Sequence, residues 1–412
     1  MSDYILAKQN GRKIPLEDKI FGISNRAKKM IAEEGKDKVI NATIGSLLDD
    51  DGNLVVLSSV VEVVKELEPV DFADYAPIGG IPPFREAVKK AAFGSFQPKR
   101  FTEAVSTPGG TGSIRNTIAN YSSPGDKILT SDWHWAPYNT IAGEMGRSID
   151  TYQMFDENGN FNAAAFAKKV DELTAVQGSL VVILNTPAHN PTGYSLTMED
   201  WEQVMQAVKT AAPKAESIVL LVDVAYIDFA GDEEEYRKFL PKLEDVPENV
   251  LPIIAYSLSK TYTLYGTRCG AMICMAQTPE IAAEFKRVCE FSSRGSWSNS
   301  AKLAQVILSK IYKDPALLKR VNEERAGYRE MLIRRGRAFE EEAKKCGLKI
   351  VPFDAGFFVS IPCDNPDEIS KKLEADGLFI VPLAKGLRVS VASISEASCR
   401  KLPAMIKAAM AE

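Results

Sequence analysis

A single lysine stands in a hydroxyl-rich segment whose residues could do chemistry. Lys260 follows the apolar run PIIAY (252–256), between Ser257 and Thr261, and Arg268 comes eight positions later. A lysine held in a partly desolvated pocket has a lowered pKa and attacks carbonyl groups, and a nearby arginine supplies a fixed cation for a phosphate. The alternative is an exposed loop lysine, because lysine is rarely buried without a partner. The segment predicts either a carbonyl-binding site or a solvated loop.

Polar residues follow two other apolar runs. Asn190 lies in the turn NTPAHNPTGYS, shortly after LVVIL (180–184). Asp223 and Tyr226 follow IVLLV (218–222). Such continuous apolar runs suit strands buried on both faces of a parallel sheet, and ligands of these sheets bind at the carboxyl ends of the strands. The polar residues are therefore expected near one another, with a tight turn at Asn190 and a helix cap at Asp223 as the alternatives.

Three further segments carry ligand-binding chemistry. Gly110 and Thr111 lie in a glycine-rich turn that opens a helix, where backbone N–H groups and the helix dipole attract an anion. The turn lacks the ending of a P-loop and the third glycine of a dinucleotide fingerprint, which argues against a nicotinamide dehydrogenase. Trp135 lies in an aromatic, partly polar segment suited to stacking on a planar ligand, with core packing as its alternative. Arg388 lies in an apolar strand-like run and requires a carboxylate partner.

Together these parts fit a ligand with a phosphate, a planar ring, a ring nitrogen that pairs with a carboxylate, and an aldehyde. Pyridoxal 5′-phosphate (PLP) has all four groups. The pattern therefore predicts PLP as the cofactor.

The rest of the sequence sets bounds on the protein class. Apolar residues make up 45%, charged residues 25%, and the formal net charge is -5, which favours a globular protein and disfavours nucleic-acid binding. No apolar run is long enough to span a bilayer, and no apolar signal core opens the chain, so a cytoplasmic protein without a membrane partner is expected. The six cysteines are scattered and only two histidines exist, which argues against a metal site.

The order of these motifs resembles the class I, fold-type I PLP-dependent aminotransferases, within them the aspartate and aromatic amino acid aminotransferases. The resemblance runs from NATIGSLLDDDG (41–52) to GLRVSVA (386–392), and the lysine segment SLSKTYTLYGTRCG is its most specific part. It implies an α/β fold with a mostly parallel central sheet in a large PLP-binding domain and a smaller α/β domain. We place the large domain at 61–309 and the discontinuous small domain at 1–60 and 310–412.

The resemblance implies a role for each candidate residue. Lys260 corresponds to the catalytic lysine that holds PLP as a Schiff base and then acts as the general base. Asp223 corresponds to the partner of the ring nitrogen, and Tyr226 and Asn190 to the residues that bind the phenolic oxygen. Trp135 corresponds to the residue that covers the ring face. The residues that bind the phosphate correspond to Gly110, Thr111, Ser257 and Arg268. Those around the substrate correspond to Arg388, which binds the α-carboxylate, Gly45, Asn190 and Trp135.

Two matches fall on residues that the family uses across a subunit boundary. Tyr75 corresponds to a tyrosine that reaches the phosphate in the neighbouring subunit, and Arg294 to an arginine for the substrate's side-chain carboxylate. They imply a homodimer with shared active sites and a dicarboxylate substrate. Two departures concern the site: Tyr138 stands where dicarboxylate enzymes keep a histidine, and the segment 46–53 lacks the aromatic residue of close relatives.

The resemblance implies a transaminase that moves an amino group from an L-amino acid to 2-oxoglutarate by a ping-pong mechanism. The amino donor is left open between aspartate, an aromatic amino acid and both. Two alternatives remain: another fold-type I PLP enzyme, such as a β-lyase or decarboxylase, and a non-catalytic PLP-binding regulator.

Overall fold

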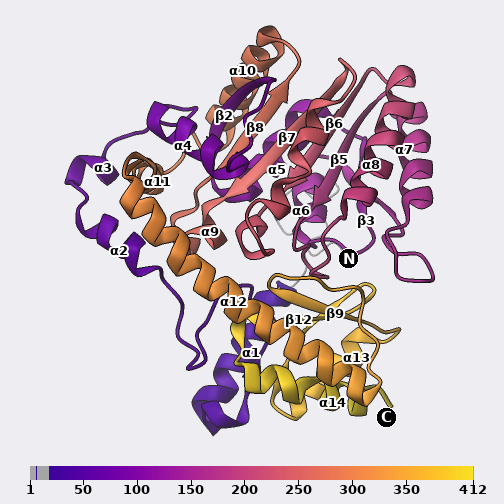
Figure 1. Ribbon diagram of the computed structural model, residues 1–412. Helices are drawn as coiled ribbons and strands as arrows, with labels where there is room; N and C mark the ends of the chain where they lie inside the picture. Colours follow the sequence, from indigo (N-terminus) through magenta and orange to yellow (C-terminus); the bar gives the residue numbers. More distant parts are fainter. Residues whose placement is uncertain (1–5, 7–17, 412) are drawn as a thin grey trace.

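The structure, a computed structural model, describes residue 6 and residues 18–411. Its largest element is a mixed sheet of seven strands in the order β2-β8-β7-β6-β5-β3-β4 (Figure 1). Strand β8 pairs antiparallel with both of its neighbours, and the remaining pairs are parallel. The α/β fold with a mostly parallel central sheet is thus confirmed. The strands are β2 (Phe101–Thr107), β3 (Lys127–Ser131), β4 (Ser148–Tyr152), β5 (Ser179–Asn185), β6 (Ser217–Asp223), β7 (Val250–Ser257) and β8 (Gly270–Ala276).

Helices pack on both faces of this sheet. They are α4 (Pro82–Phe93), α5 (Gly109–Tyr121), α6 (Pro137–Glu144), α7 (Ala163–Gln177), α8 (Met198–Ala211), α10 (Pro279–Ser296) and α11 (Lys302–Lys313). In β5, Leu180 and Val182 belong to one apolar cluster with α4, α7, α8 and α11, whereas Val181 and Ile183 belong to another with α5, α6 and α10. Because successive strand residues face opposite sides, an uninterrupted apolar run is what a sheet covered on both faces requires.

A smaller unit is built mainly from the C-terminal part of the chain. Its three-stranded antiparallel sheet has the order β11-β12-β9, and a parallel pair joins β1 to β10. A separate apolar cluster, which includes Phe339, Val359 and Leu402, forms its core. Its elements are α1 (Lys19–Glu34), β1 (Ile40–Asn41), β9 (Phe358–Pro362), α13 (Pro366–Ala375), β10 (Leu378–Phe379), β11 (Val381–Leu383), β12 (Gly386–Ser390) and α14 (Glu396–Ala411).

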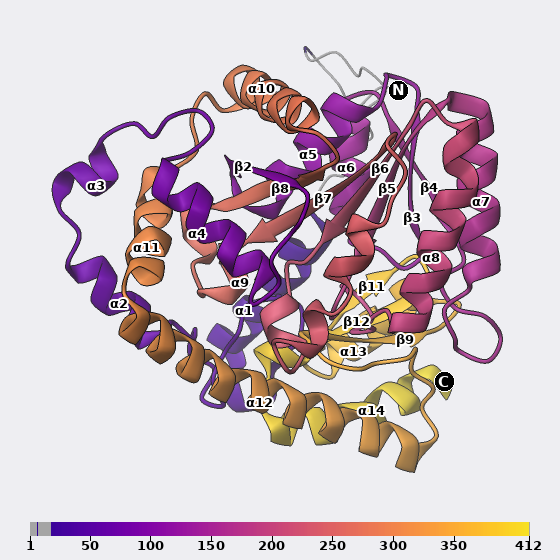
Figure 2. The same ribbon diagram turned by 45° about the horizontal axis from the view of Figure 1, so that its top comes forward.

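The long helix α12 (Pro315–Cys346) runs from the large sheet to the smaller unit (Figure 1). It begins where Asp314 accepts hydrogen bonds from the N–H groups of Ala316 and Leu317, which separates α12 from the preceding helix α11. Helices α2 (Ser58–Lys65) and α3 (Pro69–Ala73) lie at the outer edge, beside α11 (Figure 2).

The domain boundaries at 60/61 and 309/310 stay a prediction, and residues 1–5, 7–17 and 412 of the predicted small domain lie outside the described residues. Among the described residues, no helix combines the length and the apolar character needed to cross a membrane. The remaining short helices are η1 (Lys36–Lys38), η2 (Ala212–Lys214), η3 (Ile227–Phe229), η4 (Glu235–Arg237), η5 (Leu240–Glu244), α9 (Leu258–Thr261), η6 (Tyr265–Thr267) and η7 (Val391–Ser393).

Candidate active site

A polar pocket of about 140 Å³ opens at the carboxyl ends of three adjacent parallel strands. Asn185, Asp223 and Ser257, the last residues of β5, β6 and β7, all line it. The structure brings nine of the predicted residues together here: Gly110, Thr111, Trp135, Asn190, Asp223, Tyr226, Ser257, Lys260 and Arg268. It adds four that the sequence did not single out: Ile114, Asn185, Ala225 and Ser259.

Lys260 projects from the single turn of α9, which begins directly after β7. The Ser257 hydroxyl caps this turn by accepting a hydrogen bond from the Ser259 N–H at 3.3 Å. No ion pair joins Lys260 to a carboxylate of the described chain, and its Nζ lies 5.8 Å and 5.2 Å from the ring centroids of Tyr226 and Tyr265. Burial, followed by the charge of Arg268, lowers the pKa of Lys260 to about 8 against the opposing effect of Asp223. The amine is therefore prepared to act as a nucleophile or base near neutral pH.

Asp223 is a buried carboxylate held by two donors. Its Oδ2 accepts a hydrogen bond from the Tyr138 hydroxyl at 2.7 Å, and its Oδ1 accepts one from the Ala225 N–H at 3.2 Å. Burial raises the pKa of Asp223, while these hydrogen bonds and Lys260 oppose the rise. An ionised carboxylate has about four acceptor positions, so Asp223 can accept a further donor from a ligand.

Tyr138 connects Asp223 to the aromatic wall of the pocket. Its ring is fully buried in α6 and meets the Trp135 ring edge-on, with centroids 5.5 Å apart and an interplanar angle of 88°. Burial and the adjacent Asp223 keep its pKa well above the usual value, so the hydroxyl stays protonated and donates. The sequence marked this position as a departure from the family pattern, and the structure shows that a tyrosine here still contacts the aspartate.

A second group of contacts joins the pocket to the small C-terminal sheet. The Asn190 side chain donates to the Tyr226 hydroxyl at 3.4 Å and accepts from Arg388 Nη1 at 3.2 Å. Arg388 Nη2 donates to the Thr43 carbonyl at 2.7 Å, and its guanidinium lies 4.3 Å from the ring centroid of Phe358.

Arg388 is only partly satisfied by these contacts. Burial lowers its pKa to about 10, and its buried Nε has no hydrogen-bond partner among the described residues. A buried guanidinium that is paired with no carboxylate is costly, which makes it suitable for binding one from a ligand.

The opposite end of the pocket suits an anion. Gly110 and Thr111 lie in the first turn of α5, where unpaired N–H groups and the positive end of the helix dipole are found. Arg268 has a left-handed backbone with φ of 50°, and its Nη1 donates to Ser259 Oγ at 3.3 Å and to the Tyr265 carbonyl at 3.0 Å. A Cβ on Gly109 would come within 2.9 Å of Arg268 Nη2, so glycine lets the arginine approach the helix end. An anion cradle, a carboxylate and a reactive amine thus share one pocket, as PLP requires.

Comparison with known proteins decides the family. The family model for aminotransferase class I and II matches residues 37–406, which is most of the chain. The chain belongs to the class I and II aminotransferases. Enzymes of this family depend on PLP, so the protein is a transaminase with PLP as its cofactor.

Individual relatives agree with this assignment. The aminotransferase is 35% identical to one from Anaerococcus prevotii of known structure, with a TM-score of 0.96, over 99% of this chain and 100% of that one. It is 27% identical over 403 residues to the mitochondrial aspartate aminotransferase of Schizosaccharomyces pombe, covering 95% of this chain and 88% of that protein. An aromatic-amino-acid aminotransferase from Burkholderia pseudomallei, solved with PLP covalently bound, shares the fold at 21% identity, with a TM-score of 0.80 and coverage of 98% and 100%.

Four predicted residues of the aminotransferase do not line the pocket: Arg388, Gly45, Tyr75 and Arg294. Tyr75 is 85% exposed in the segment after α3. Arg294 is exposed near the end of α10, where its Nη1 donates to Ser298 Oγ at 2.6 Å. Both side chains are exposed in the single chain. Their roles across a subunit boundary stay predictions.

Gly45 does not line the pocket but lies beside Phe358, the ring that packs against Arg388. A Cβ at this position would come within 2.6 Å of Phe358 Cζ, on the ring that packs against Arg388. A side chain here would displace the ring and with it the guanidinium. Glycine at position 45 therefore preserves the geometry of Arg388.

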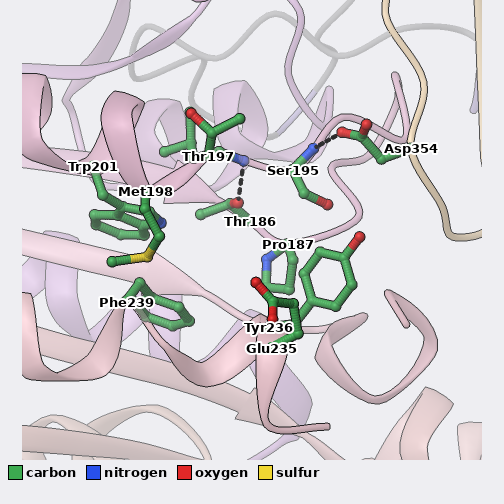
Figure 3. Close-up of a pocket in the computed structure, with 11 residues that line it drawn as sticks. Thr186, Pro187, Ser195, Thr197, Met198, Trp201, Glu235, Tyr236, Phe239 and Asp354 are labelled. Carbon is green, nitrogen blue, oxygen red and sulfur yellow. Dashed lines mark hydrogen bonds between the residues drawn. The ribbon is translucent and has the colours of Figure 1, made fainter. Parts of the chain in front are cut away.

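The aminotransferase has a second cavity of about 250 Å³ (Figure 3). It is lined in part by Thr186, Pro187 and Ser195, which belong to the same loop as Asn190. Figure 3 shows Ser195, whose N–H donates to Asp354 at 2.8 Å, and Thr186, whose hydroxyl accepts from the Leu196 N–H at 3.1 Å. Its lining contains no lysine, arginine or histidine. It therefore lacks both the amine and the anion cradle that distinguish the first pocket. No group of residues suited to hold a metal ion occurs in the described part of the chain.

Proposed function

We propose that this transaminase moves the amino group of an L-amino acid to 2-oxoglutarate in a ping-pong reaction, with Lys260 as the covalent attachment point of PLP and as the base. The observation that carries this proposal is Lys260 itself, an amine with its pKa lowered to about 8 in a pocket shared with Asp223 and Arg268. A lysine in an ordinary exposed loop has neither the lowered pKa nor these neighbours.

In this proposal, each pocket residue binds one part of the cofactor. Asp223 pairs with the ring nitrogen, and Tyr226 and Asn190 bind the phenolic oxygen. When bound, PLP supplies an electron-withdrawing ring that stabilises negative charge on the substrate's α-carbon. The buried Asp223, which accepts hydrogen bonds from Tyr138 and Ala225, supports that role because a carboxylate favours a protonated ring nitrogen. Trp135 is assigned to the ring face, and the phosphate is assigned to Gly110, Thr111, Ser257 and Arg268.

Lys260 is the group assigned to carry the proton. It is assigned to accept the proton from the substrate's α-carbon, which requires a neutral amine near the operating pH. Burial and the adjacent Arg268 provide this condition by lowering the pKa. Neither of the two histidines lines the pocket.

Arg388 is assigned to the substrate's α-carboxylate. Its Nε has no partner, while the other guanidinium nitrogens are fixed by Thr43 and Asn190. Two fixed contacts leave the arginine oriented before substrate arrives, which favours a planar carboxylate. Asn190 contacts both Arg388 and Tyr226, so it lies between the substrate end and the cofactor end.

A homodimer with shared active sites is part of the proposal. Six of the eleven exposed large apolar side chains among the described residues lie in the segment 54–75, and Phe291 of α10 is exposed as well. Such surfaces mark interaction sites when they gather in one region, and a second copy of the chain would cover them. The same region contains Tyr75, and Arg294 lies on the same helix as Phe291. We therefore assign Tyr75 to the phosphate and Arg294 to the substrate side chain of the partner's pocket. A cytoplasmic location, expected from the sequence, is also part of the proposal.

A panel of amino donors against 2-oxoglutarate tests this function. Aspartate and aromatic amino acids are compared in the wild type, in Arg294→Ala and in Arg287→Ala, which removes another exposed arginine of α10. We expect Arg294→Ala to lower kcat/KM for aspartate on the order of 100-fold, because a charged side-chain carboxylate loses its partner, and to change kcat/KM for aromatic donors far less. Aspartate turnover that survives while aromatic turnover collapses would contradict the role of Arg294. No turnover with any donor would contradict the proposed function.

A further inference from the structure

The turn that follows Lys260 contacts a distant segment of the chain at two points. The Tyr265 hydroxyl accepts a hydrogen bond from the Leu47 N–H at 3.0 Å. The Thr263 hydroxyl accepts one from the Leu57 N–H, also at 3.0 Å. Both leucines are fully buried, so each N–H depends on the protein for its partner. The turn that follows Lys260 is thereby attached to the segment 47–57.

The residues just before that segment are attached to β12. Arg388 Nη2 donates to the Thr43 carbonyl at 2.7 Å, and the Ser390 hydroxyl donates to the Ile44 carbonyl at 2.7 Å. Leu47 follows only three residues after Ile44. Residues 43–47 therefore connect β12, which contains Arg388, to the turn that follows Lys260. Tyr265 provides the contact on the side of that turn.

Tyr265 also borders the reactive groups directly. Its ring centroid lies 5.2 Å from Lys260 Nζ, and its carbonyl accepts a hydrogen bond from Arg268 Nη1 at 3.0 Å. Burial raises the pKa of Tyr265, so the hydroxyl that accepts the hydrogen bond from the Leu47 N–H is neutral. One side chain thus contacts the amine with its ring and the segment 43–47 with its hydroxyl.

We propose that Tyr265 is a positioning residue that keeps Arg388 in register with Lys260 through the segment 43–47. The inference rests on the proposed function, in which Arg388 binds the substrate carboxylate and Lys260 acts on the adjacent α-carbon. The carboxylate and the reacting hydrogen are attached to one carbon atom, so the two protein groups must hold a fixed spacing. Catalytic arrangements lose activity when such spacing shifts by about 0.5–1 Å.

Tyr265→Phe removes the hydroxyl and retains the ring beside Lys260. The Leu47 N–H then loses its buried partner, and the segment 43–47 is no longer fixed to the lysine turn. We expect kcat/KM for the amino donor to fall about tenfold, mostly through KM, because substrate binding depends on the spacing between the two groups. The dissociation constant of PLP should stay within about twofold, since the pocket residues assigned to the cofactor are unchanged.

Thr263→Val is the matched control. It removes a hydroxyl acceptor of the same kind from the same turn, but its partner Leu57 lies ten residues beyond Leu47. Thermal unfolding of both variants measures the structural cost, and we expect kcat/KM of Thr263→Val to stay within about twofold of the wild type.

The outcomes separate this inference from the proposed function. A wild-type protein that binds PLP and transaminates, with a selective KM increase in Tyr265→Phe, supports the positioning role. Equal losses of kcat/KM in Tyr265→Phe and Thr263→Val would mean that both contacts only stabilise the fold. That result would overturn the positioning role of Tyr265. Wild-type kinetics in Tyr265→Phe would overturn it as well. A wild-type protein that fails to transaminate would instead remove the proposed function itself.

Discussion

The cofactor side of the candidate site and the residues assigned to the partner subunit are built in opposite ways. Asn185, Asp223 and Ser257 are consecutive strand ends of one sheet, and they meet in one pocket because the sheet places them side by side. Tyr75 and Arg294 lie on exposed segments outside that pocket.

This difference separates what one chain can do from what needs two. A rigid sheet holds most of the groups assigned to PLP in place, so we expect a single chain to contain every cofactor-binding group except Tyr75, which is assigned to the partner's pocket. The residues assigned to the substrate side chain acquire a function only when a second copy brings them to a pocket. Chemistry is thus predicted to depend on the first region, and substrate choice on the second.

The largest expected effect tests the cofactor side. Lys260→Ala should lower transamination on the order of 10⁴-fold or more, because both the covalent attachment and the base are lost. Lys238→Ala, which removes an exposed lysine paired with Glu235, is the control. Single-turnover rates measure both variants. A loss smaller than about tenfold in Lys260→Ala would assign the chemistry to another residue.

Asp223→Ala should come next, with kcat/KM reduced on the order of 10²- to 10³-fold and weaker PLP binding. The variant leaves the ring nitrogen without an anionic partner in a buried site. Asp354→Asn alters a carboxylate of the second cavity and provides the control. Steady-state rates and PLP titration monitored by absorbance check the result, and equal effects in both variants would contradict a specific role for Asp223.

Mixing two variants that are both impaired with aspartate tests whether the second region acts on the partner's pocket. Lys260→Ala and Arg294→Ala are combined, unfolded together and refolded. In a mixed dimer with shared sites, one pocket carries both defects and the other carries neither. Random pairing should then restore about one quarter of the wild-type aspartate activity. If Arg294 serves the pocket of its own chain, every pocket keeps a defect and no activity returns.

The smallest effect is a shift in pH dependence. PLP is captured by the neutral amine, so the capture rate should fall as pH drops through the pKa of Lys260. Because burial and Arg268 lower that pKa to about 8, we expect a midpoint near pH 8 rather than above pH 10. Stopped-flow absorbance after mixing apoprotein with PLP measures it. A midpoint above pH 10 would mean that the lysine is solvated and that the cofactor side is less enclosed than the structure indicates.

Much of the cofactor side could be predicted from the sequence because local patterns determine it. The apolar runs 180–184, 218–222 and 252–256 lie within β5, β6 and β7, and polar residues at their ends share the pocket. The glycine-rich turn likewise opens α5. Periodicity and turn chemistry within a few residues are sufficient for these features.

Several side-chain contacts of the site could not be predicted, because the two residues in each contact are distant in the sequence. The hydrogen bond between Tyr265 and Leu47 spans 218 positions, and that between Tyr138 and Asp223 spans 85. Phe358 contacts Arg388 only because β9 and β12 pair in the small sheet. No local signal identifies such contacts, since they depend on how the whole chain packs.

The most direct test of the central claim is to locate the lysine that holds the cofactor. The PLP-loaded protein is reduced with borohydride, digested, and mapped by mass spectrometry. We predict a single modified peptide, with the pyridoxyl group on Lys260, and none in Lys260→Ala. Modification of a different lysine as the main product, or a wild-type protein that carries no pyridoxyl group, would contradict this account.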